Sequence, residues 1–100
     1  MSEPPRRGEV WSIDAGISVL VISCTVYNGI PSEPTVVVVP VFDTEPDTGF
    51  GVDLGVGWVA PGLVASLRKA RLRERRRQLD VQTLTDVNNM LFKILATPDR

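Results

Sequence analysis

The chain has 100 residues, with eleven Lys or Arg against twelve Asp or Glu, 43% hydrophobic residues, one cysteine and no histidine. This composition fits one small folded domain, and the length excludes two domains. Without histidine the chain lacks the usual general base near neutral pH and the usual metal ligand, so Ser-His and Cys-His nucleophile pairs and His-rich zinc sites are excluded. One cysteine excludes thiolate zinc clusters. We expect no metal and no cofactor.

The single cysteine, Cys24, and the lack of an apolar leader favour a reducing cytoplasm, and we expect Cys24 to be buried and inert. The longest apolar stretch, residues 17–27, falls far short of the ~20 residues that span a bilayer, so no membrane segment is expected. A domain this small has little stability to spare, which favours oligomerisation.

The net charge of −1 hides a division along the chain. Residues 1–62 hold two basic and eight acidic residues, whereas residues 63–100 hold nine basic and four acidic ones. Seven cations and one anion fall within residues 68–77. Such a density attracts polyanions, either nucleic acid or an acidic protein tail. The alternative is a solvated helix face or turn.

Residues 1–8 are polar, contain two prolines and are expected to form a flexible tail, with a single domain over residues 9–100. Imperfect alternation over residues 9–14 predicts a strand near a sheet margin. After a turn, residues 17–27 are almost continuously β-branched and apolar, which predicts a strand buried on both faces. Asn, Gly and Pro then mark a loop over residues 28–34.

Residues 35–42 predict a second buried strand, with Pro40 at a bulge or strand end because proline cannot donate to the ladder. An acidic turn follows at residues 43–49. Residues 50–54 alternate and predict a half-exposed strand. One more strand is expected over residues 58–67, interrupted in the middle by Pro-Gly.

The end of the chain has helical periodicity. Asp80 is placed to cap a helix, and Leu79 to pack against Leu84. Thr97-Pro98 ends it. The apolar helix positions are Leu84, Val87, Leu91, Ile94 and Leu95, and the predicted core is Val19, Val21, Val37, Val39, Leu84, Leu91 and Leu95. The predicted fold is mainly β: a small curled antiparallel barrel with a C-terminal amphipathic α-helix.

Several motifs in order resemble the MazF/PemK family of toxin ribonucleases. They are Arg7-Gly8-Glu9-Val10-Trp11, Val26-Tyr27-Asn28, Val38-Val39-Pro40-Val41, Thr48-Gly49-Phe50, Lys69-Ala70-Arg71-Leu72 and the closing helix. The resemblance spans residues 6–96. It implies a CcdB/PemK-like barrel, a homodimer, single-stranded RNA bound in a dimer groove and cleaved, and a cognate antitoxin whose acidic, apolar tail competes for that groove.

The sequence departs from this family where the chemistry is expected. The family's glycine-containing loop and its Arg-Pro pair are missing, and Ile17 and Ser18 stand at that place. The Thr or Ser that usually follows the Val-Pro strand is replaced by Phe42 and Asp43, with Thr44 two positions late. Upstream of Lys-x-Arg-Leu the family shows Gln-x-Arg-Thr-Ile-Asp. This chain keeps only a hydroxyl, at Ser66, and an aliphatic side chain, at Leu67. No catalytic residue of the family transfers onto this chain.

RNA cleavage without metal needs a base near the 2′-hydroxyl, a cation against the phosphate and an acid for the leaving oxygen. The candidates for catalysis are Asp14, Asp43, Thr44 and Arg68, and those for nucleic-acid binding are Arg68, Lys69, Arg71, Arg73 and Arg75. Each has a plain alternative, because Asp and Thr also start turns and arginines also keep a domain in solution.

The two tryptophans, Trp11 and Trp58, are either base-stacking platforms or part of the core. Two functions remain open: an endoribonuclease toxin with a rearranged, weakened site, or a non-cleaving relative that binds RNA or an antitoxin tail. A third, a topoisomerase poison like the CcdB toxins, fits the motifs less well, and fold alone does not choose among them.

Overall fold

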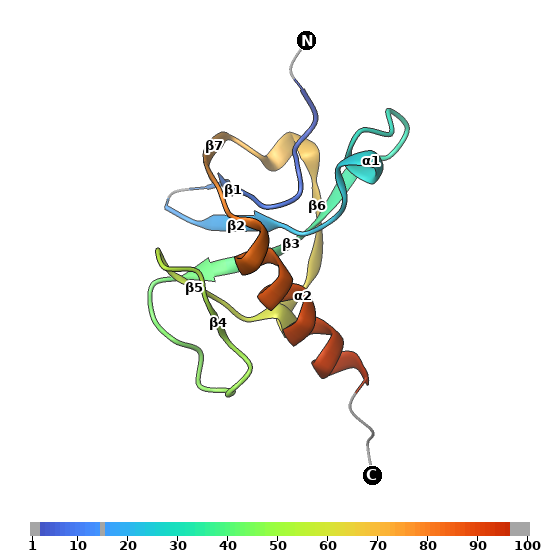
Figure 1. Cartoon of the computed structure of the whole chain (residues 1–100). Coiled ribbons are helices and arrows are strands. Elements are labelled where there is room, and N and C mark those ends of the chain that lie inside the picture. Colours follow the sequence, from blue (N-terminus) through green and yellow to red (C-terminus); the bar gives the residue numbers. More distant parts are fainter. Residues whose placement is uncertain (1–2, 15, 97–100) are drawn as a thin grey trace.

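The computed structural model describes residues 3–14 and 16–96 and consists of a curled antiparallel sheet with one long helix against it (Figure 1). Within these residues the strands are β1 (Glu9–Ser12), β2 (Ser18–Val21), β3 (Thr35–Phe42), β4 (Val52–Asp53), β5 (Trp58–Val59), β6 (Ala65–Arg68) and β7 (Glu74–Gln78). The helices are α1 (Thr25–Asn28), the 3₁₀ turns η1 (Pro61–Leu63) and η2 (Lys69–Arg71), and α2 (Val81–Ala96). The predicted fold class, mainly β with a C-terminal helix, is confirmed.

The strands follow the order β4-β5-β3-β2-β1-β7, and β6 pairs with the first half of β3. All pairs are antiparallel. Within the described residues no ladder joins β6 to β7, so the sheet curls toward a barrel without closing.

Two apolar clusters cover the two faces of this sheet, because alternate side chains of a strand point to opposite sides. Leu20, Val39 and Val59 belong to the face that packs against α2. Val19 and Val21 belong to the other face, together with Val36 and Val38. Among the residues that the structure describes, the side chains packed on that second cluster are Trp11, Ile13, Leu67 and Leu72, which belong to strands and loops, so the curl of the sheet buries it.

Pro40 lies inside β3, opposite Val19 of β2, and the prediction of a bulge or strand end was wrong. On its other edge β3 pairs with β6 through Val38 and with β5 from Val41 onward. Pro40 therefore falls in the gap between those two partners, where a missing N–H is tolerated.

The predicted strand over residues 17–27 ends at Val21, and the rest of that prediction was wrong. The Ser23 hydroxyl accepts the N–H of Val37 at 3.0 Å, and the buried Asn28 amide donates to the Ser23 carbonyl at 3.0 Å. These local bonds compete with a ladder and turn the chain into α1. β-Branched composition predicted the strand, but the polar residues end it.

The turn into α1 exposes side chains that a buried strand would have covered. Val26, on α1, is 82% exposed, and Cys24 is also exposed, so the prediction of a buried cysteine was wrong. Asn28 also donates to the Pro5 carbonyl at 2.9 Å, which brings part of the segment before β1 against the domain. The boundary between a tail and a domain at residue 9 stays a prediction.

The helix α2 begins and packs as predicted. The N–H of Thr83 donates to Asp80 Oδ1 at 2.7 Å, and Leu79 and Leu84 pack in the same apolar cluster. Val87 is buried, but Leu95 is 73% exposed because the second half of α2 extends beyond the sheet (Figure 1). Assigning Leu95 to the core was therefore wrong. Val37, Leu84 and Leu91, also assigned to the core, are only half-buried. Thr97-Pro98, the predicted helix stop, lies outside the described residues.

Candidate nucleic-acid interface

The basic run of residues 68–77 starts at the end of β6 and continues through the turn η2 into the edge strand β7, so it is not the face of an α-helix. β7 pairs with β1 through its backbone, which requires no apolar side chains. All five β7 residues are exposed, and rows of charge are a common way to protect a sheet edge. Because neither face of β7 is apolar, hydrophobic alternation could not reveal this strand.

Asp14 lies in the hairpin between β1 and β2 and contacts two arginines of the basic run. Arg71 Nη2 lies 2.6 Å from Asp14 Oδ2, and Arg73 Nη2 lies 3.7 Å from Asp14 Oδ1. The hairpin is closed by the Ile17 N–H, which donates to the Asp14 carbonyl at 2.6 Å. Gly16 has φ +83°, which favours glycine in this turn. The short hairpin therefore holds Asp14 beside the two cations.

A polar hollow of about 410 Å³ opens beside this cluster. It is lined by Ser12, Ile13, Asp14, Gly16, Ser18, Arg73, Glu74 and Arg76. Glu74 Oε1 lies 2.6 Å from Arg76 Nη1, so both carboxylates of the hollow are in ion pairs. The hollow thus presents guanidinium groups to an anion, and the carboxylates of Asp14 and Glu74 are already paired with arginines.

Arg75 lies in the middle of β7 and has different partners. Its Nε is 2.9 Å from Oε2 of Glu9, and its guanidinium lies over the Trp11 ring at 5.6 Å from the centroid. Trp11 also packs on the apolar cluster inside the curl, so its role in the core is confirmed. Trp58 pairs with Phe42 and is half-buried on β5.

The other predicted residues lie elsewhere. Arg68 pairs with Thr35 at the start of β3, and Lys69 Nζ donates to the Ile30 carbonyl at 3.2 Å. Asp43 and Thr44 are exposed in the loop after β3. In the part of the chain that the structure describes, no hydrogen bond or ion pair joins any of these four residues to Asp14. The structure thus brings Asp14, Arg71 and Arg73 together and leaves the rest apart.

Thr44 lines a second, larger hollow of about 910 Å³ between the acidic loop, η1 and α2. Its lining is Phe42, Thr44, Glu45, Pro46, Asp47, Thr48, Phe50, Ala60, Gly62, Leu63 and Ile94. No residue lines both hollows. This second hollow has an apolar floor and an acidic rim, which suits an apolar protein side chain better than a phosphate.

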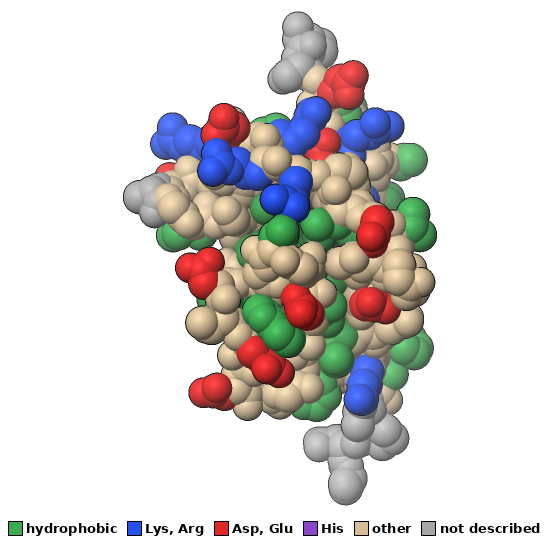
Figure 2. Space-filling model, turned by 60° about the vertical axis from the view of Figure 1, so that its left-hand side comes forward, with side chains coloured by type: hydrophobic (Ala, Val, Ile, Leu, Met, Phe, Trp, Pro, Cys, Tyr) green, Lys and Arg blue, Asp and Glu red, His purple; other side chains and the backbone are tan. Residues whose placement is uncertain are grey.

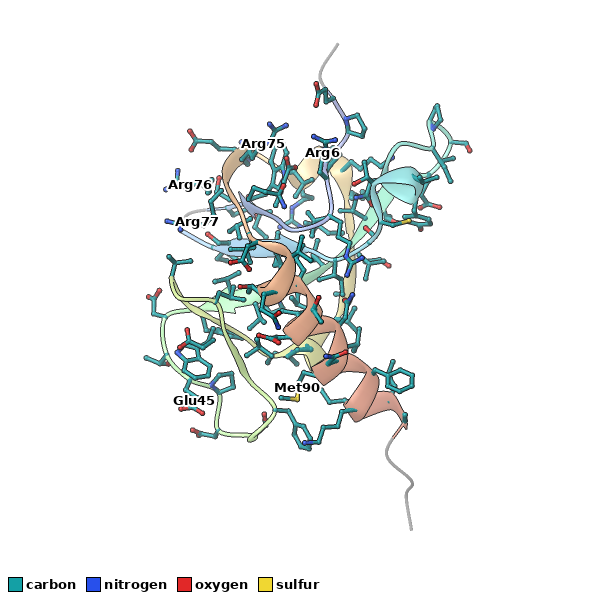
Figure 3. The ribbon with its side chains drawn as sticks, in the orientation of Figure 1. Arg6, Glu45, Arg75, Arg76, Arg77 and Met90 are labelled. Carbon is teal, nitrogen blue, oxygen red and sulfur yellow. The ribbon has the colours of Figure 1, made fainter. Side chains whose placement is uncertain are left out.

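The two charge types also separate over the surface. Figure 2 shows most Lys and Arg side chains in the upper part of the molecule and mainly Asp and Glu below them. In Figure 3, Arg75, Arg76 and Arg77 project from the upper part and Glu45 lies at the lower end. The charge division along the chain is therefore a division in space. The basic run of residues 68–77 already included Arg76 and Arg77, although the named binding candidates stopped at Arg75.

Two carboxyl groups outside this edge have shifted pKa values. The Thr35 hydroxyl and N–H lower the pKa of Glu33, and the Thr83 hydroxyl and N–H lower the pKa of Asp80. No group of three or more metal-ligating side chains occurs within residues 3–14 and 16–96. No helix among those residues is long and apolar enough to cross a membrane.

Comparisons with known proteins give one family. Residues 6–95 match the family model described as "PemK-like, MazF-like toxin of type II toxin-antitoxin system". No curated protein matches the sequence significantly.

Three solved structures illustrate the fold. An endoribonuclease from Mycobacterial species matches with a TM-score of 0.83 and 24% identity over 100% of this chain and 98% of that one. An endoribonuclease in complex with its cognate antitoxin, also from Mycobacterial species, matches with a TM-score of 0.81 and 24% identity over 96% and 99%. A MazE-MazF complex from Deinococcus radiodurans matches with a TM-score of 0.83 and 22% identity over 96% and 100%.

Proposed function

Because the chain belongs to the PemK-like, MazF-like toxins of type II toxin-antitoxin systems, we propose that it is an endoribonuclease that acts on single-stranded RNA in the cytoplasm. The observation that carries the proposal is the basic edge, which we define as Arg71, Arg73, Arg75, Arg76 and Arg77 on η2, β7 and the connection between them. This edge borders a polar hollow at the β1–β2 hairpin. Guanidinium groups bind phosphates well because their planar donors match the phosphate oxygens.

The hollow supplies part of the chemistry for cleavage. Arg71 and Arg73 stabilise the charge that develops on the phosphate, and Asp14 is the carboxylate placed to accept the 2′-hydroxyl proton. The attacking 2′-oxygen bonds to phosphorus, the bond to the 5′-oxygen breaks, and that oxygen takes up a proton from water, while the 2′-hydroxyl proton stays on Asp14 until it returns to solvent. Both oxygens of Asp14 contact arginines, so Asp14 must first separate from them before it can reach a 2′-hydroxyl. We therefore expect slow cleavage that does not require metal.

A second candidate is a toxin relative that binds RNA without cleaving it. It is favoured by the ion pairs of Asp14 and Glu74, because both carboxylates of the hollow are already engaged. Binding needs only the cations, whereas cleavage also needs a free base.

We also propose two protein partners. The first is a second copy of this chain, because Phe92 is 71% and Leu95 is 73% exposed on α2, and α2 packs against η1, where Leu63 is 55% exposed. The second is an antitoxin whose acidic, apolar tail competes with RNA for the basic edge. The structures of related toxins with antitoxins support such a partner.

The test begins with induction of the chain in a bacterial host and mapping of RNA ends. Purified protein is then assayed on a long unstructured RNA with a chelator present, comparing the parent with Arg71→Ala, Asp14→Asn and, as a control at the distant end, Glu45→Gln. Slow cleavage that resists the chelator and is lost in Arg71→Ala supports the enzyme. RNA binding without any cleavage supports the second candidate. Rapid cleavage abolished by the chelator contradicts both.

Sedimentation across micromolar concentrations tests the dimer. A dimer that dissociates on dilution is expected, since a small core makes the folded state depend on protomer concentration. A stable monomer throughout that range removes this proposal.

A further inference from the structure

Glu9 is a buried carboxylate that the proposed cleavage does not use. It is 2% exposed, and each of its oxygens has a partner. Oε1 accepts the N–H of Arg6 at 2.8 Å and the indole Nε1–H of Trp11 at 3.0 Å. Oε2 forms the ion pair with Arg75 Nε at 2.9 Å. Burying a charge costs free energy unless the charge is fully paired. Movement of Arg6, Trp11 or Arg75 away from Glu9 would leave the carboxylate unpaired, so these three partners are held in place.

The backbone holds Glu9 in place. Gly8, just before it, has φ +93° and an added Cβ there would lie 2.6 Å from Leu84 Cδ1. The Gly8 N–H donates to the Val21 carbonyl at 2.8 Å, and the Gly8 carbonyl accepts the Leu79 N–H at 2.9 Å. The start of β1 is therefore bonded on both sides. The positive φ and the lack of room for a Cβ explain why glycine precedes the glutamate.

A bulge in β7 selects Arg75 as the partner. Val10 pairs with Arg77 and Trp11 pairs with Arg75, so Arg76 is the extra residue. Directly paired residues share a face of the sheet, and Glu9 shares a face with Trp11 because they are two residues apart. In a regular ladder Arg76 would stand opposite Trp11, and Arg75 would point to the other face.

The result is a guanidinium held from two sides. Its Nε is bonded to Glu9 and its plane lies near the Trp11 ring, while the Arg75 side chain stays 47% exposed. Within the described residues its Nη groups have no ion pair, in contrast to those of Arg71, Arg73 and Arg76. A fixed side chain loses little entropy when it binds, so such a group binds an anion more tightly than a mobile one.

We propose that Glu9 and Trp11 are positioning residues that hold Arg75 as a fixed phosphate-binding group for single-stranded RNA. The inference rests on the proposed function and assigns a role to the Gly-Glu-Val-Trp motif. It makes an unusual prediction. Glu9→Gln raises the net charge of the chain by one, from −1 to 0, so simple electrostatics expects tighter RNA binding. Positioning expects weaker binding, by about three- to tenfold, because Arg75 becomes mobile.

The experiment measures binding of a fluorescent oligouridylate to the full chain at several salt concentrations. Glu9→Gln keeps an oxygen for Arg6 and Trp11 but loses the negative charge facing Arg75. Glu45→Gln is the matched control, because it removes the same charge at the opposite end of the molecule (Figure 3). We expect weaker binding for Glu9→Gln only. Binding by Glu9→Gln that equals or exceeds that of the parent overturns the inference.

Arg75→Lys keeps the test decisive if Glu9→Gln fails to fold. Lysine retains the charge but not the Nε group, so we expect affinity to fall about fivefold while the salt slope stays unchanged. Arg75→Ala reduces that slope by about 0.7, the value for one phosphate of a single strand. Unchanged affinity in Arg75→Lys overturns the inference while leaving RNA binding intact. Absence of RNA binding by the parent overturns the proposed function as well.

Discussion

The basic edge and the acidic loop of residues 43–49 lie at opposite ends of the same sheet and are built differently. At the basic edge, the described arginines are mostly engaged in ion pairs around a polar hollow. At the acidic end, Glu45 and Asp47 form the rim of a larger hollow with an apolar floor. The first environment suits a polyanion, and the second suits a protein surface. Cations outnumber anions at the first end and anions dominate the second, so an anionic ligand is steered toward the basic edge.

The largest effect is expected when the basic edge is disabled. Replacing Arg71, Arg73 and Arg76 by Ala removes three phosphate contacts, so the slope of log affinity against log salt should fall by about 2. Any cleavage should fall by at least ~100-fold, since removing one preorganised donor to developing charge already costs about that much. The measurement is a salt titration with oligouridylate together with a cleavage assay.

The control replaces the same number of charges at the acidic end, with Asp43→Asn, Glu45→Gln and Asp47→Asn. RNA binding should not weaken in that variant, because removing anions there cannot remove a phosphate contact. Equal losses in the two triple variants would show that only net charge matters and that the two ends do not differ in function.

The second prediction concerns the apolar cluster between the sheet and α2, which lies between the basic edge and the acidic loop. Leu20 is fully buried between the sheet and α2, so Leu20→Ala should lower the free energy of unfolding by about 2–5 kcal/mol. Leu95→Ala should change it by less than ~0.5 kcal/mol in the monomer, because Leu95 is exposed. Urea unfolding measures both. Similar losses for the two variants would contradict the observed burial.

The third prediction separates assembly from RNA binding by each protomer. Phe92 and Leu95 lie on one face of α2, three residues apart, away from the basic edge. If this face joins two copies, Phe92→Ser with Leu95→Ser should raise the dimer dissociation constant at least ~10-fold, since each buried apolar side chain contributes about 1.5–3 kcal/mol. Sedimentation velocity measures the change. An unaffected dimer would place the interface on another surface.

The sequence predicted the elements whose side chains alternate or repeat. The buried strand at residues 35–42 and the helix with its Asp80 cap follow directly from such patterns. β7 escaped prediction because its ladder with β1 is formed by backbone groups and its side chains are all polar. The strand at residues 17–27 was overextended because its composition concealed the backbone bonds of Ser23 and Asn28.

The site was predicted less well than the fold, for a related reason. The charge run identified the cations, but pairing partners come from distant parts of the chain. Arg71 meets Asp14 only because β7 lies beside β1, and Arg75 meets Glu9 only because of the bulge at Arg76. Register of this kind leaves no mark in residue spacing, so neither pair was predicted.

The smallest effect is expected at Asp80, which joins the basic edge strand to the helix that covers the acidic end. The Thr83 hydroxyl and N–H lower the pKa of Asp80 from its ordinary value of 3.8. A carboxyl with a lowered folded pKa stabilises the fold fully above the unfolded value and loses that contribution as the pH falls through the folded value. Asp80→Ala should therefore lower Tm at neutral pH, and the difference from the parent should shrink only below about pH 4.

Asp80→Asn is the matched variant, because asparagine caps a helix nearly as well as aspartate but does not ionise. Its difference in Tm from Asp80→Ala should stay constant from pH 7 to about pH 3, whereas that of the parent should not. Thermal unfolding across this range measures both. If the parent and Asp80→Asn depend on pH in the same way, the ionised form of Asp80 contributes nothing to the start of α2, and the junction between the two ends is held by the packing of Leu79 with Leu84 and by backbone bonds such as that from the Leu79 N–H to the Gly8 carbonyl.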